Sequence, residues 1–210
     1  MRLRALLGLV LLVAASGCAV LGQGKGEVHS DALYADECWR GPFDLNPDFF
    51  AAVPFRDTLQ IRVQRGDDRQ EVSDSLLVLV DDVTGIRSLD LGAPIPVGLA
   101  PQLVAAIAPS ATRGPAPRVG LSLALQSSCH NQNVALYALR GTITFDALFS
   151  GDPNEEVGSE KLSEARFEVE MADPRDATPG TLDVPAAKTS LVTGSFSFHF
   201  QRGQPGQPFP

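Results

Sequence analysis

The sequence predicts an all-β domain: an antiparallel β-sandwich with one short helix or, as the alternative, an open β-barrel. Three observations lead to this prediction. Several segments alternate apolar and polar residues with a period of two, which is the repeat of a strand with one buried face. Turn-forming sequences such as RGDD (65–68), GDPN (151–154) and DPRDATPG (173–180) separate these segments. Six or seven strands connected by such turns are typical of a sandwich or a barrel.

The predicted strands fall into two kinds. Regular alternation marks the segments 57–65 (DTLQIRVQR), 118–126 (RVGLSLALQ), 164–171 (EARFEVEM) and 194–201 (GSFSFHFQ). The segment 74–83 (DSLLVLVDDV) is instead a continuous apolar run bounded by acids, which predicts a strand buried on both faces. The segment 134–149 (VALYALRGTITFDALF) is one bent strand or two, with Gly141 at the bend or bulge.

The last strand carries three aromatic side chains in alternate positions. Phe196, Phe198 and Phe200 are separated by Ser197 and His199. Because successive side chains of a strand point to opposite faces, we expect the three rings to share one face and to lie in the core.

One segment has the character of a helix. GLAPQLVAAIAP (98–109) contains helix-forming residues, with Pro101 near its start and Pro109 at its end. Proline is well tolerated in the first turn of a helix and ends a helix when it follows it, so we expect a short helix here.

The chain begins like an exported protein. Arg2 and Arg4 precede an apolar stretch from residue 5 to about residue 15, the charged and apolar regions of an export signal. This stretch is shorter than the roughly 20 apolar residues that span a membrane, and no second apolar run in the sequence reaches that length.

The residues after the apolar stretch resemble the lipobox of bacterial lipoproteins. The matching sequence is Ala15-Ser16-Gly17-Cys18, with alanine where leucine is commoner in the family. The resemblance implies that the Cys18 thiol forms a thioether with diacylglycerol and that the chain is cut just before it. Two or three acyl chains would then hold the protein on the membrane. Ala19 is not the aspartate associated with inner-membrane retention in this family, so we expect the outer membrane, facing the periplasm or the cell surface.

These signals divide the chain into four parts. The predicted parts are a signal peptide (1–17), a lipidated flexible tether (18–37), a β-sandwich domain (38–201) and a Pro-rich C-terminal tail (202–210). The tether contains the polar, Gly-rich stretch GQGKGEVHS (22–30), which favours flexibility. The Phe-x-Phe-x-Phe strand followed by a tail that ends in Gln-Pro-Phe-Pro (207–210) is similar to uncharacterised bacterial lipoproteins, which implies no known activity.

The charge of the chain bears on its partners. The formal net charge is −8, and removing residues 1–17, which contain two arginines and no acid, makes it −10. Binding to nucleic acid requires clustered Lys and Arg, so no nucleic acid partner is expected. An acidic chain also gains nothing from anionic lipid by charge, so the expected contact with the membrane is the anchor at Cys18.

Two cysteines remain once Cys18 is assigned to lipid. Export places Cys38 and Cys129 in an oxidising compartment, where two thiols in one domain are expected to pair. The closed loop of about 90 residues would stabilise the fold by up to roughly 4–5 kcal/mol. The alternative is two separate buried thiols.

The sequence offers few residues with the pattern of a catalytic or metal site. GLSLA (120–124) is close to the nucleophile elbow of hydrolases, but Ser122 lies in the middle of a predicted strand and the motif ends in alanine. The three histidines, His29, His130 and His199, are far apart in the sequence, whereas a catalytic zinc needs three converging ligands.

Two further groups have some features of binding residues. Asp152, Asn154 and Glu156 begin like a calcium loop, but Val157 stands where the loop needs glycine, so a solvated hairpin loop is favoured. The aromatic residues Tyr34, Trp39 and Tyr137 are candidates to line a groove, although a tryptophan beside a cysteine more often packs on the disulfide. No catalytic, cofactor-binding or metal residue is assigned, and no cofactor is expected.

The function predicted from the sequence is a membrane-anchored lipoprotein of the cell envelope. Its domain is expected to be a non-enzymatic binding or structural module with a protein or glycan partner. The alternative is an envelope hydrolase or a metal-dependent enzyme. A cleft that joins Ser122 to a histidine and an acid would favour the enzyme, and an exposed groove or patch would favour the binding module.

Overall fold

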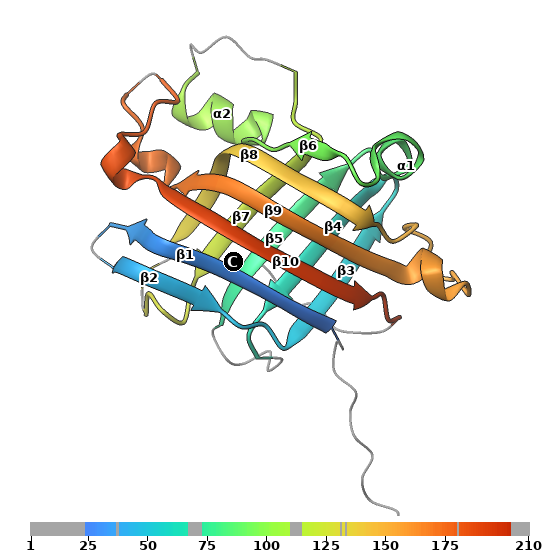
Figure 1. The fold of residues 1–210 in the computed structure, drawn as a ribbon. Coiled ribbons are helices and arrows are strands. Elements are labelled where there is room, and N and C mark those ends of the chain that lie inside the picture. The colour runs from blue at the N-terminus through green and yellow to red at the C-terminus, as the bar shows by residue number, and fades with distance from the viewer. Residues whose placement is uncertain are drawn as a thin grey trace, which may run out of the picture.

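One curled antiparallel sheet makes up most of the protein (Figure 1). The computed structural model describes residues 24–36, 38–66, 73–109, 115–130, 132, 134–179 and 181–202. The predicted all-β class is confirmed: strands predominate, and the helical elements among the described residues are short. The predicted signal peptide, Cys18 and the C-terminal segment 203–210 lie outside the described residues.

Ten strands of the described chain form the sheet, and six short helical elements lie between some of them. The strands are β1 (Gly24–Ala35), β2 (Trp39–Leu45), β3 (Phe49–Phe55), β4 (Thr58–Gln64), β5 (Asp74–Asp81), β6 (Pro94–Pro96), β7 (Val119–Leu125), β8 (Ala135–Ala147), β9 (Leu162–Ala172) and β10 (Ser190–His199). The helical elements are α1 (Val83–Gly85), η1 (Ile86–Asp90), α2 (Pro101–Ile107), η2 (Gly158–Lys161), η3 (Pro174–Asp176) and η4 (Ala186–Lys188).

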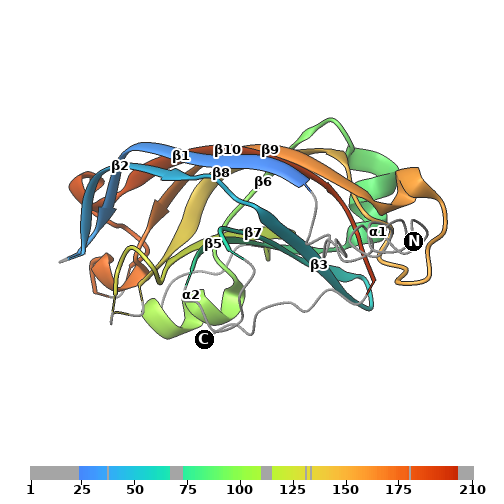
Figure 2. The same ribbon diagram turned by 90° about the horizontal axis from the view of Figure 1, so that it is seen from below.

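The sheet forms a half-barrel. Its strand order is β2-β1-β10-β9-β8-β7-β5-β4-β3, with β6 paired to β8. Strongly twisted open sheets of this size tend to curl, and here the β1–β10–β9 side faces the β7–β5–β4 side (Figure 2). Across the interior, the Phe50 ring of β3 stacks on the Phe198 ring of β10 with centroids 5.8 Å apart. The open barrel is therefore the better description of the two predicted arrangements, although its two halves pack face to face as in a sandwich.

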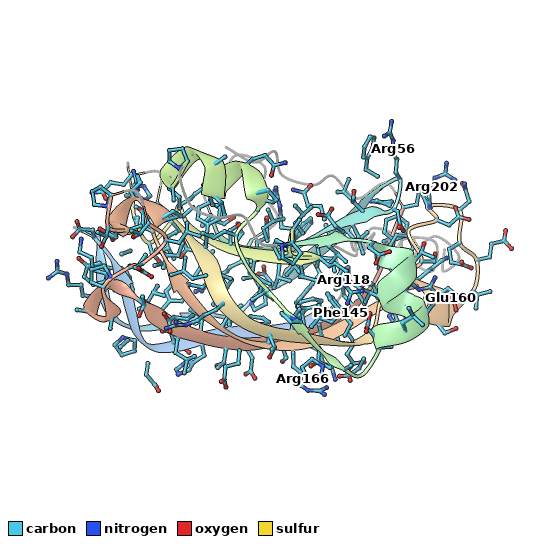
Figure 3. All side chains as sticks on the ribbon, turned by 90° about the horizontal axis from the view of Figure 1, so that it is seen from above. Arg56, Arg118, Phe145, Glu160, Arg166 and Arg202 are labelled. Atoms are coloured by element: carbon cyan, nitrogen blue, oxygen red, sulfur yellow. A yellow bond between two sulfur atoms is a disulfide. The ribbon has the colours of Figure 1, made fainter. Side chains whose placement is uncertain are left out.

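The interior is filled by side chains that the alternation predicted. Phe145 points into it from β8, whereas Arg166 on the neighbouring β9 points away (Figure 3). On each alternating strand the apolar set is buried, as predicted: Leu59, Ile61, Val63, Val119, Leu121, Leu123, Leu125, Ala165, Phe167, Val169 and Met171. The predicted short helix at 98–109 is confirmed as α2.

The aromatic face of the last strand is also confirmed. Phe196 and Phe198 are each 2% exposed and belong to the core. Phe200 is half-buried at the rim, where its ring stacks on Phe149 with centroids 4.1 Å apart. His199 lies on the opposite, exposed face.

The segment 134–149 contains a single bent strand, β8 (Ala135–Ala147), rather than two. Gly141 adopts φ +126°, and an added Cβ there would lie 2.3 Å from the carbonyl oxygen of Glu168. The pairing of β8 with β9 shifts register between Ala138 and Arg140, directly before this glycine. The predicted bulge is therefore present, and it requires a residue without a side chain.

The prediction of a flexible tether over 18–37 is wrong for most of that range. Residues 24–35 form β1, which pairs with β10 on one side and with β2 on the other. Gly24 and Gly26 do not loosen the chain here; they let Phe50 pack against it, because an added Cβ on Gly24 would lie 2.6 Å from that ring. The folded domain therefore includes residues 24–35 and does not start at residue 38.

The disulfide between Cys38 and Cys129 is present. Cys38 follows β1 and Cys129 follows β7, and their Cα atoms lie 5.5 Å apart. The bond therefore ties one wall of the half-barrel to the other at one end. Beside it, the Asp74 carboxylate accepts hydrogen bonds from the backbone N–H groups of Ser127 and Ser128.

Candidate functional site

The short helix α2 lies over the outer surface of the half-barrel (Figure 2). After β6 the chain leaves the sheet, and Pro101 begins the helix, since its fixed φ suits the first turn. Gln102 is the one polar residue of the helix, and none of the helix side chains is fully buried. An apolar helix that is only partly covered leaves apolar surface in contact with solvent.

A cleft of about 430 Å³ separates α2 from the sheet, and we call it the α2 cleft. Strands β5, β7 and β8 form its floor, and the α2 segment forms the wall opposite that floor. The lining residues are Leu77, Leu79, Gly120, Leu121, Ser122 and Tyr137 on the sheet, and Gly98, Leu99, Ala100, Gln102, Leu103 and Ala106 opposite them. A second hollow of about 480 Å³ adjoins it and shares Gly98 and Leu99.

Strand register explains why the floor is apolar. Leu77 pairs with Ser122, and Ser122 pairs with Tyr137, so these three side chains form one row on the outer face. In the next row Leu79 pairs with Gly120, which leaves room above the sheet. The prediction that β5 is buried on both faces is therefore only half right. Leu76, Val78 and Val80 are buried inside, but Leu79 is 39% exposed in the cleft because α2 does not close over it.

The polar groups that line the α2 cleft are two hydroxyl groups and one amide. Ser122 and Tyr137 contribute hydroxyl groups and Gln102 contributes an amide. Among the residues that the structure describes, neither a histidine nor a carboxylate lines the cleft. A serine nucleophile needs a base within hydrogen-bond reach, and the described lining supplies none beside Ser122.

The three histidines occupy separate places. His29 on β1 lies within hydrogen-bond distance of Asp44 (2.6 Å) and Asp31 (3.1 Å), and the hydrogen bond to Asp44 is the main cause of its raised pKa. His130 follows the disulfide, with Nδ1 3.3 Å from the Ser127 carbonyl oxygen, and His199 ends β10. In the part of the chain that the structure describes, no group of three or more His, Cys, Asp or Glu residues is placed to hold a metal ion.

The acidic loop after β8 uses its oxygens to build turns. Asp152 accepts a hydrogen bond from the backbone N–H of Asn154, and the Glu155 carboxylate accepts one from that of Val157. The Asn154 side-chain oxygen accepts a hydrogen bond from Arg202 (3.0 Å). These contacts favour a hairpin loop over a calcium site.

The three candidate aromatic residues do not line one groove. Tyr137 lies in the α2 cleft, whereas Tyr34 on β1 packs beneath the cations of Arg40 and Lys188. Trp39 contacts Phe43 edge-on, in a polar pocket of about 510 Å³ near the disulfide.

The polar side chains that line this pocket mostly bond to other residues of the domain. Its three carboxylates each have a partner within the domain. Asp74 binds Ser127 and Ser128, Asp48 binds the Gly66 amide, and Asp44 binds His29. These contacts therefore favour a structural role for the pocket, in holding together the end of the half-barrel, over a role in ligand binding.

Sequence reasoning missed the α2 cleft, although two signals pointed toward it. The run Leu76–Val80 has large apolar residues on both faces, and the α2 segment has no polar face. Together they indicate apolar surface outside the sheet. What they do not give is how far the helix covers it.

The described residues form an all-β half-barrel with a mainly apolar cleft on its outer wall. No family model, no curated protein and no solved structure matches the chain. Among the described residues, no helix is long and apolar enough to cross a membrane.

Proposed function

We propose that the protein is a lipoprotein of the cell envelope, anchored through Cys18 to the outer membrane, whose half-barrel is a non-enzymatic binding module. The single observation that carries the binding role is the α2 cleft, an apolar hollow with three polar groups along its floor and rim. Pockets of this composition and size are typical of binding sites.

The lining of the cleft favours an apolar protein segment over a glycan. A sugar placed against Leu77, Leu79 and Leu103 would lose hydrogen bonds to water that these side chains do not replace, at a cost of roughly 1–3 kcal/mol for each buried group. An apolar peptide segment loses little water-bonded surface there. Its few backbone groups can pair with Gln102, Ser122 and Tyr137, so we favour the protein partner.

The anchoring half of the proposal is supported by the lipobox resemblance and by charge. The acidic chain has no electrostatic reason to remain on an anionic bilayer, so a covalent lipid is what would keep it there. The oxidised Cys38–Cys129 pair is consistent with export, because disulfides persist mainly outside the reducing cytosol.

Site-specific photo-cross-linking in cells tests the binding role. A photoreactive residue at Leu103, in the wall of the cleft, should give a discrete cross-linked product. The matched control is Leu191, which is 59% exposed on β10 outside the cleft and should give none. Leu79→Glu on the opposite wall should remove the Leu103 product. Equal products from both positions, or none from Leu103, would show that the cleft is not the binding surface.

A further inference from the structure

The segment 203–210 (GQPGQPFP) follows the last described residue, Arg202. It contains three prolines and Phe209, and it carries no charged side chain. Proline favours the extended polyproline conformation, which rises about 3.1 Å per residue, so eight residues span about 25 Å. A sequence that favours one extended conformation loses less conformational entropy on binding than a fully flexible one.

The described chain ends where this segment can reach the outer wall. Arg202 donates a hydrogen bond to Asn154, and just before it Phe198 stacks on Phe50 of the edge strand β3. Phe50 is in register with Val63 of β4, which is in register with Leu76 of β5. Two strand spacings of about 4.8 Å separate β3 from β5. The next residue of β5, Leu77, lies in the floor of the α2 cleft, within the reach of the segment.

The outer faces of β3 and β4 show features of a covered surface. Phe49, Ala51 and Arg62 point away from the interior, yet they are only 1%, 6% and 7% exposed. The residues that face α2 across the cleft come from β5, β7 and β8, and none comes from β3 or β4. The covered outer surface of β3 and β4 therefore lies between the α2 cleft and the edge of the sheet, on the side where the described chain ends.

We propose that residues 203–210 fold back over the outer faces of β3 and β4 of the same molecule and place Phe209 at the Leu77 end of the α2 cleft. This inference rests on the same cleft as the proposed function and makes the segment a built-in competitor for it. The uncharged segment suits the apolar lining, and its prolines have no N–H groups to desolvate. Its carbonyl oxygens can accept hydrogen bonds from Ser122 and Tyr137.

Tethering makes even weak binding effective. A short flexible connection gives an effective concentration in the millimolar range. A segment with an intrinsic dissociation constant of about 100 μM would then fill the cleft in about nine molecules out of ten. An external partner would bind roughly tenfold more weakly than it binds a chain without the segment.

A peptide experiment tests this without any partner. The probe is a fluorescent peptide of residues 203–210, measured by anisotropy against the lipidated protein in nanodiscs that hold one copy each. The two proteins compared are the full chain and the chain ending at Arg202. We expect saturable binding to the shortened chain and at least tenfold weaker binding to the full chain. We expect a Phe209→Ala peptide to bind at least tenfold more weakly as well.

Matched variants locate the site. Leu77→Gln in the shortened chain should abolish peptide binding, whereas Leu191→Gln, outside the cleft, should not; thermal melts verify that both variants fold. The proposal is overturned if the peptide fails to bind the shortened chain, if it binds both chains equally, or if Leu77→Gln has no effect. These results are independent of the cross-link from Leu103 in cells, so either proposal can fail while the other stands.

Discussion

Phe198 joins the two walls of the half-barrel, and its truncation is the sharpest test of the core. The ring is 2% exposed, stacks on Phe50 at 5.8 Å and contacts Phe196 at 6.1 Å. Phe198→Ala removes a buried aromatic side chain and leaves a cavity between the walls, which typically costs about 3–5 kcal/mol. A domain of this kind has a total stability of only about 5–15 kcal/mol.

The expected change in melting temperature is large enough for a standard thermal melt to detect. For a domain of this size, 1 kcal/mol lowers the melting temperature by about 2–4 °C, so Phe198→Ala should lower it by about 6–20 °C. The assay is thermal unfolding followed by circular dichroism, with the disulfide kept intact. Ser197→Ala is the matched control, since Ser197 lies on the outer face of the same strand and its loss should change little.

A small effect would refute the reasoning. If Phe198→Ala melts within about 2 °C of the unmodified protein, the aromatic face of β10 does not hold the walls together. That face would then have to be an interaction surface, and the variant would lose partner binding while keeping its stability.

Three further predictions concern the anchor, the disulfide and a histidine. Cys18→Ser should abolish labelling by an alkyne fatty acid, because serine cannot form the thioether; a mutant that still labels would exclude this lipidation site. Cys38 and Cys129 should resist alkylation in the denatured, unreduced protein and react after reduction, and free thiols in freshly extracted protein would contradict the bond. His29 should titrate above its ordinary pKa of 6.5, chiefly because of its hydrogen bond to Asp44, so its pairing is fully formed below pH 6.5 and lost as the pH rises through the raised value. Asp44→Asn should move the NMR-observed pKa of His29 back toward 6.5, and an unchanged titration would disprove that cause.

Many strands of the sheet can be predicted from local sequence, because the alternation of apolar and polar residues in a strand with one buried face shows which side chains point into the core. Leu59, Ile61 and Val63 alternate without interruption, and the same repeat places Phe196 and Phe198 in the core. In β1 this alternation is interrupted. Its pairing with β2 shifts register between Ser30 and Leu33, so the buried residues no longer keep a period of two along the strand.

The candidate site was less accessible to sequence reasoning because it depends on how separate elements meet. The alternation correctly puts Ser122 on the outer side of β7, but it does not show that Leu77 and Tyr137 flank it there. Nor does the composition of α2 show that the helix stops short of covering Leu79. Cleft geometry arises from tertiary packing, for which a single sequence contains no local signal.

The early start of β1 has a consequence for the position of the domain on a membrane. With a lipid on Cys18, six residues up to position 23 would separate the anchor from Gly24, and even fully extended they span only about 20 Å. Gly24 is in register with Phe198, so the start of β1 and the end of β10 emerge at one end of the half-barrel, and that end would be held near the lipid headgroups. The domain would then sample a shallow layer above the bilayer in a restricted range of orientations. Partners embedded in the same membrane would meet it far more often than proteins diffusing freely in the surrounding compartment.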